Sequence, residues 1–101
     1  MAERENLHTI LESLLGSGNV YYQPPETTKM RYPAIRYSRS RMDSKYANNK
    51  KYSMMDCYEL TVIARLPDDP VIKELLQLPY CSYDRHYVAD NLHHDVLTIY
   101  Y

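Results

Sequence analysis

Apolar residues recur at helical spacing near the start of the chain. They occupy positions i, i+3, i+4, i+7 and i+8 of one stripe: Leu7, Ile10, Leu11, Leu14 and Leu15. This spacing is typical of a helix that buries one face. Gly16 and Gly18, the only glycines of the sequence, follow at once and favour its end. The pattern predicts a helix that lies against another layer.

Alternating apolar and polar residues predict strands farther along. A short extended piece covers residues 19–22, and a strand covers residues 34–39, because Pro33 disfavours a helix leading into it. The clearest strand lies within residues 56–66, with Ile63 as the exception to its alternation. Its inner face is predicted to consist of Tyr58, Leu60, Val62, Ala64 and Leu66.

A second, shorter helix is predicted between two prolines. Asp69 is a suitable N-cap, Pro70 suits the first helical position and Pro79 ends the helix. The residues expected to face inward are Val71, Ile72, Leu75 and Leu76. Residues 81–101 then indicate two strands joined by a turn at Asp90-Asn91.

The order helix, strands, helix, strands predicts an α+β fold. We expect a single domain, residues 1–101, in which two helices pack on one face of a mainly antiparallel β-sheet. The polar stretch "SRMDSKYANNKK" predicts a long extended hairpin loop between two of the strands. A length of 101 residues leaves no room for a second domain.

Three features of the composition add to these expectations. The sequence has twelve Tyr but no Phe and no Trp, so every large aromatic ring carries a hydroxyl suited to half-buried surfaces. Cys57 and Cys81 form no CxxC motif, and we expect two reduced thiols. The N-terminus is charged where a signal peptide would be apolar, so we expect synthesis in a cytosol.

The segment "DRHYVADNLHHDV" concentrates three of the four histidines. A tight turn at Asp90-Asn91 pairs Val88 with His93, Tyr87 with His94 and His86 with Asp95. One face then carries His86, His93, Asp95 and Asp84, and the other, expected on the core side, carries Tyr83, Tyr87, Ala89, Leu92, His94 and Val96.

Two histidines and a carboxylate on one face resemble a zinc or non-haem iron site. Such a site also needs a cavity and supporting partners, which a short hairpin does not supply. We therefore predict a structural hairpin with no metal. No GxSxG motif and no glycine-rich phosphate loop is present, and we expect neither an enzyme nor a cofactor.

Charge is divided unevenly along the sequence. Residues 29–51 contain eight Lys and Arg against Asp43 alone, a net charge of +7, so the rest of the chain carries −8. Tyrosines are interleaved with these cations: Tyr32, Tyr37, Tyr46 and Tyr52. This arrangement suits a single-stranded nucleic-acid-binding module that uses residues 29–52, a solvated hairpin, or a basic arm that docks on the acidic surface of a neighbouring subunit.

We favour the third interpretation, because a long polar segment with few aliphatic side chains has little to bury locally. The arm is predicted to cover residues 38–52 and to be ordered by contact with another subunit. The residues predicted to form the subunit interface are Arg36, Arg39, Arg41, Lys45, Tyr46, Lys50 and Lys51.

Four stretches carry a resemblance to a known family: "YPAIRYSRS", "YELTVIARLPDD", "PVIKELLQLP" and above all "CSYDRHYVADNLHHDVLTIYY". They resemble the tail-terminator or tail-completion proteins of long-tailed bacteriophages over nearly the whole chain. The resemblance implies an α+β subunit of a hexameric ring in the virion, assembled in the host cytoplasm. Its implied partners are copies of itself, the tail-tube protein and the head-connector or stopper protein, with DNA passing only through the ring lumen. A neighbouring head-completion protein is the alternative within this group.

Overall fold

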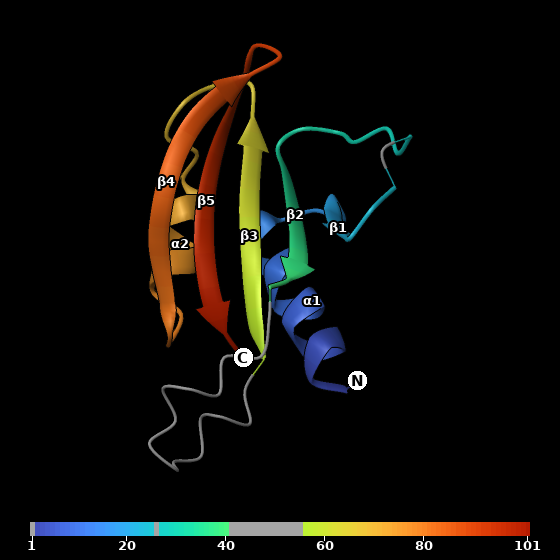
Figure 1. The fold of residues 1–101 in the computed structure, drawn as a ribbon, viewed down its shortest axis with the longest axis vertical. Helices are drawn as coiled ribbons and strands as arrows, with labels where there is room; N and C mark the ends of the chain where they lie inside the picture. Colours follow the sequence, from blue (N-terminus) through green and yellow to red (C-terminus); the bar gives the residue numbers. More distant parts are fainter. Residues whose placement is uncertain (1, 26, 41–55) are drawn as a thin grey trace.

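The computed structural model describes residues 2–25, 27–40 and 56–101. Within these residues, two helices and five strands follow one another (Figure 1). They are α1 (Ala2–Leu15), β1 (Val20–Tyr22), β2 (Ala34–Arg39), β3 (Cys57–Ala64), α2 (Val71–Leu76), β4 (Cys81–Ala89) and β5 (Leu92–Tyr100). The predicted arm and hairpin loop lie outside the described residues, apart from Ser38 and Arg39, which belong to β2, and Ser40.

The five strands form one sheet in the order β1-β2-β3-β5-β4. β1 runs parallel to β2, and the other neighbours are antiparallel. The last strand of the chain therefore lies inside the sheet, and β4 forms one edge. The predicted α+β class with a mainly antiparallel sheet is confirmed.

The hydrophobic core lies between one face of this sheet and both helices. Ile35 and Tyr37 of β2 stand opposite Val62 and Leu60 of β3, and Leu60 stands opposite Leu97 of β5. The same face meets the buried residues of the helices, Leu7, Leu11, Val71 and Leu75. The sheet is thus covered by helices on one face only, and Figure 1 views it from the other face.

Helix α1 follows the predicted apolar stripe. Leu7 and Leu11 are fully buried, whereas Leu14 and Leu15 pack at the margin of the core. Gly16 has a φ of +82°, a conformation that glycine adopts without strain, and its N–H bonds the Glu12 carbonyl at 2.9 Å. The helix therefore ends where the sequence predicted.

Buried tyrosines keep their hydroxyls partnered at the edge of the core. The Tyr37 hydroxyl lies 2.7 Å from His8 Nδ1 and accepts a hydrogen bond from the Arg4 guanidinium at 3.3 Å. Burial raises the pKa of Tyr37 above its ordinary value. Tyr58 donates from its hydroxyl to Asp56 at 3.4 Å. The core can therefore use tyrosine where most proteins would use phenylalanine.

Helix α2 begins after the predicted cap. The Asp69 carboxylate accepts a hydrogen bond from the Val71 N–H at 3.0 Å, and Pro70 has helical dihedral angles. Val71 and Leu75 are buried as expected, but Leu76 is exposed, which corrects the sequence prediction. Six residues make fewer than two turns, so α2 buries only a narrow stripe.

Strand β3 has a buried residue on nearly every position. Tyr58, Leu60 and Val62 face the helices as predicted, while Ile63, the exception in the pattern, is buried on the other face between Ala34 and His94. The prediction for Leu66 was wrong: β3 ends at Ala64, and Leu66 is 75% exposed.

The β4–β5 hairpin has the predicted register. Ala89 pairs with Leu92, Val88 with His93, and His86 with Asp95 across a turn in which Asp90 and Asn91 both have positive φ. Its faces were assigned wrongly. Asp95 alternates with the core residues Leu97 and Ile99, so the face with His86, His93 and Asp95 is the one that the helices share.

A bulge at Asp84 explains a second difference between the predicted hairpin and the structure. The register shifts between Tyr83 and Arg85, which places Tyr83 on the face of Asp95 instead of the face of Tyr87. Sequence alternation without the extra residue had placed Tyr83 and Tyr87 together.

Val62→Asp should prevent folding, because Val62 is fully buried in the core and no described cation lies opposite it in the sheet. Circular dichroism and thermal melting measure the effect. A soluble Val62→Asp protein that melts cooperatively would contradict the core assignment, and Val62→Ile is the matched apolar control.

Candidate interaction surface

The predicted interface residues fall into two groups. Arg36 and Arg39 lie on β2, whereas Arg41, Lys45, Tyr46, Lys50 and Lys51 lie outside the described residues. Arg36 pairs with Thr61 on the helix-free face, and Arg39 pairs with Tyr58 on the helix face. The two arginines therefore project from opposite faces of one strand, next to the same edge of the sheet.

Neither arginine side chain has a hydrogen bond or ion pair within the part of the chain that the structure describes. Only the backbone N–H of Arg39 is bonded, to Gln23 Oε1 at 3.2 Å. Arg36 lines a polar hollow of about 210 Å³ together with Gln23, Ser38 and Glu59. Both guanidinium groups can therefore bind an acidic partner without breaking a hydrogen bond or ion pair to any described residue.

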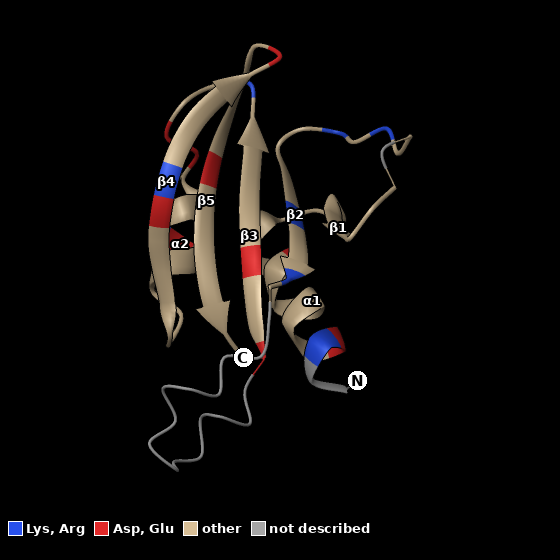
Figure 2. Ribbon diagram, viewed as in Figure 1, with Lys and Arg blue, Asp and Glu red and all other residues tan. Residues whose placement is uncertain are grey.

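Two more cations extend this basic group. Lys29 and Arg31 are exposed in the loop before β2, so the described residues from Asn19 to Ser40 contain four basic side chains and no acidic one. We call this region the basic side: Lys29, Arg31, Arg36 and Arg39. Figure 2 shows these positions as blue segments along β2 and its loop.

The opposite side of the sheet is acidic. From Arg65 to Asp90 five acidic residues stand against Arg65, Lys73 and Arg85, and Arg85 already forms an ion pair with Asp84 at 2.8 Å. The acidic residues are Asp68, Asp69, Glu74, Asp84 and Asp90. Figure 2 draws them as red segments around α2, on β4 and at the β4–β5 turn, whereas other red segments lie on α1, β3 and β5. We call this region the acidic side.

The acidic side also carries the exposed apolar residues. In residues 2–25, 27–40 and 56–101, every large hydrophobic side chain classed as exposed comes from this region: Leu66, Leu76, Tyr80, Tyr83, Tyr87 and Val88. Apolar groups surrounded by charged ones are typical of protein interfaces. The sequence does not reveal this surface, because the tyrosine-rich composition indicates half-exposed rings but not their position.

The histidine cluster forms stacked pairs at the same side. The His86 and His93 rings stack with centroids 5.4 Å apart, and His86 Nε2 lies 3.2 Å from His93 Nδ1. Tyr87 and His94 stack on the other face at 4.6 Å. Among the described residues, no group of three or more His, Cys, Asp or Glu is arranged to hold a metal ion.

Asp95 is a buried carboxylate with a close partner. The Tyr83 hydroxyl donates to Asp95 Oδ1 at 2.6 Å, and this hydrogen bond raises the pKa of Tyr83 to about 12. Because the raised pKa favours the protonated phenol in the folded state, the stabilisation is complete below about pH 10, where unfolded tyrosine is also protonated. It is lost as the pH rises through about 12.

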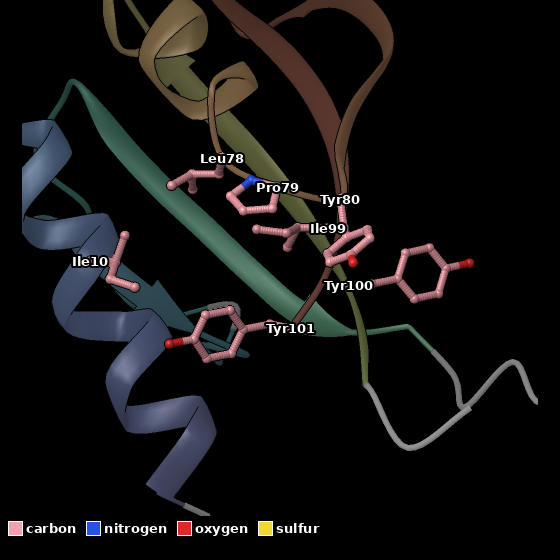
Figure 3. A pocket seen from close by; sticks show the side chains of 7 residues that line it. All are labelled: Ile10, Leu78, Pro79, Tyr80, Ile99, Tyr100 and Tyr101. Atoms are coloured by element: carbon pink, nitrogen blue, oxygen red, sulfur yellow. The ribbon is translucent and has the colours of Figure 1, made fainter. Parts of the chain in front are cut away.

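An apolar hollow of about 370 Å³ lies at the end of the sheet where the chain ends. Figure 3 shows Ile10 of α1 at one side and Tyr80 and Tyr100 at the other, with Leu78 and Pro79 between. Tyr101 closes it, held by two backbone hydrogen bonds with Asp56 at 3.0 and 3.3 Å. Its lining can contact an apolar side chain but offers almost no polar group to orient a ligand.

No protein-family model matches the chain, and no curated protein or solved structure matches it significantly. In the described part of the chain, no helix has the length and apolar character needed to cross a membrane. The function must therefore be argued from the surfaces themselves.

Replacing His86 and His93 together with Asn should change the free energy of unfolding by no more than about 0.5 kcal/mol, because His86 is exposed and His93 is half-buried. Urea denaturation measures the change. Loss of folding in this double variant would contradict the interpretation of the pair as a surface feature.

Tyr83→Phe should lower the free energy of unfolding by about 1 kcal/mol at neutral pH, because it removes the donor to the Asp95 carboxylate. The loss of stability is small because Tyr83 is 43% exposed, and water weakens the interaction with the carboxylate. Urea denaturation at pH 7 and at high pH measures it. The wild-type advantage should disappear as the pH passes through about 12; equal stabilities at pH 7 would contradict the role of this hydrogen bond.

Proposed function

We propose that this protein is a structural subunit that assembles with copies of itself into a closed ring. The ring is of the kind that ends the tail tube of a long-tailed bacteriophage and joins the tail to the head connector. Two observations support this proposal: the resemblance of the four sequence stretches to tail-terminator proteins, and the opposite charge of two sides of the subunit. The subunit would act in the virion and would be assembled in the host cytoplasm.

The observation that carries the proposal is the opposite charge of two sides of one subunit. The basic side has cations without partners in the described residues, and the acidic side has carboxylates and exposed tyrosines. A contact between different patches on successive copies is heterologous, and it closes into a ring when the rotation between copies allows. Charge complementarity also fixes which patches meet.

The proposal assigns the protein no catalytic residue and no cofactor. Besides its own copies, the ring would contact the tail-tube protein and the head-connector or stopper protein, and DNA would only pass through its lumen. A head-completion protein beside the terminator would use the same surfaces, and the ring contact is common to both.

Binding of single-stranded nucleic acid is the competing function. The unpartnered cations of the basic side support it, since they could contact phosphates. The described part of the basic segment offers few aromatic rings on which bases could stack, because Tyr37 is only 1% exposed and packs in the core. Tyr32 is half-buried there, with the Arg65 guanidinium 5.7 Å from its ring.

Reversing Arg36 and Arg39 together to Glu should abolish self-association while leaving the subunit folded, because both side chains are without partners in the described residues. Light scattering on the full chain, with circular dichroism as a folding check, measures this. Raising salt from about 0.05 M to about 0.5 M should weaken wild-type association in the same direction. If the wild type does not associate on its own, the tail-tube protein is added to every sample to start assembly.

The matched control is the double variant Arg65→Glu with Lys73→Glu. It changes the net charge by the same amount but makes the acidic side more acidic, so it should associate at least as well as the wild type. A variant with Arg36 and Arg39 reversed that associates normally but loses binding to single-stranded DNA would overturn the assembly proposal in favour of the nucleic-acid function.

A further inference from the structure

Among the described residues, no strand lies beside the outer edge of β4. β4 stands at the end of the sheet order, and residues 82–88 are all exposed. No described segment pairs with it on that side. An edge of nine residues is a template to which another extended chain can bind through its backbone.

Antiparallel alternation determines which backbone groups point outward. In a hairpin with a two-residue turn, the pair Ala89 and Leu92 is hydrogen-bonded, so the N–H and C=O groups of Val88 and His86 point away from β5. At the other end, the Tyr100 N–H bonds the Tyr80 carbonyl at 3.1 Å, which directs the backbone groups of Cys81 and Tyr83 outward.

The bulge divides this edge into two short templates. Asp84 interrupts the register between Cys81–Tyr83 and His86–Val88, and the Asp84–Arg85 ion pair lies at the interruption. Bulges and charged residues protect edges from unselective pairing. Only a partner that matches a short stretch and tolerates the charges can bind, and the stretch nearer the turn carries the more exposed apolar side chain, Val88, at 58%.

The distribution of charge favours a second copy of this chain as the partner of the β4 edge. The contact would be heterologous, with different surfaces of the two copies meeting. In a two-fold pairing of β4 with β4, the acidic side of one subunit would meet the acidic side of the other, and Asp68, Glu74 and Asp90 would repel their counterparts. The basic side of a second copy removes this repulsion and brings cations that lack partners in the described residues.

We propose that the edge of β4 at His86–Val88 binds the loop before β2 of a second copy, residues 27–33 with Lys29 and Arg31, through backbone hydrogen bonds, so that the sheet continues across the subunit contact. β2 itself is already paired on both sides and cannot be the added strand. The inference rests on the proposed ring and adds the element through which neighbouring subunits join. Tyr87 and Val88 flank the added strand on the two faces of the sheet.

Val88→Pro tests the contact, because it removes an outward N–H without removing a hydrogen bond to β5. The protein concentration at half-assembly should rise at least about tenfold. Val88→Ile keeps the N–H and the β-branched apolar shape, and should stay within about twofold of the wild type. Assembly of Val88→Pro at the wild-type concentration would overturn the inference.

Hydrogen exchange on the wild type gives a second measurement that needs no variant. The amides of His86 and Val88 should exchange at least about tenfold more slowly in the assembled protein than in the subunit, whereas the amide of Ser17, in the exposed turn after α1 and outside both charged sides, should not change. Assembly without this protection would overturn the β4 contact but leave the ring proposal standing. A wild type that stays monomeric, alone and with tail-tube protein, would overturn both.

Discussion

The pairing of β3 with β5 is the interaction on which the rest of the structure depends. Eight residue pairs join a strand from the middle of the chain to the last strand, and they bring Leu60 onto Leu97 and Tyr58 onto Ile99 beneath the helices. Until this non-local contact forms, neither helix has a complete surface to cover. Because β5 takes the inner position, the hairpin that joins it to β4 leaves β4 at the edge, with one backbone side that no described strand pairs with.

The same pairing places a carboxylate on the face that the helices share. Asp95 stands opposite Val62 and is buried, so its charge needs a donor close by. The bulge at Asp84 supplies one by turning Tyr83 onto the face of Asp95, where the hydroxyl lies 2.6 Å from the carboxylate. One extra residue in an edge strand thus satisfies a buried charge and also interrupts the edge that a partner strand would follow.

Local sequence patterns were enough to predict the helices and strands. The surfaces could not be predicted, because they depend on contacts between residues far apart in the sequence. The turn at Asp90-Asn91 specified the hairpin register because a two-residue turn fixes pairing by itself. The core side of that hairpin was assigned wrongly, because it depends on where β3 and the helices meet it, and the bulge leaves no mark in the alternation. The basic segment was visible from charge alone, but the acidic side gathers residues from α2, β4 and two turns, which only the fold brings together.

Tyrosine explains how one residue type serves both the core and the surface. Tyr37 and Tyr58 bury their rings and keep their hydroxyls partnered at the core margin, whereas Tyr80, Tyr83 and Tyr87 leave rings exposed beside α2 and β4. Exposed rings add little to the stability of a lone subunit, since their apolar area stays in water. They stabilise a contact that removes this area from water, and the surrounding carboxylates restrict that contact to a basic partner. Among the described residues, the basic side gathers four cations and no carboxylate, so the distribution of rings and charges favours the same head-to-tail contact with another copy.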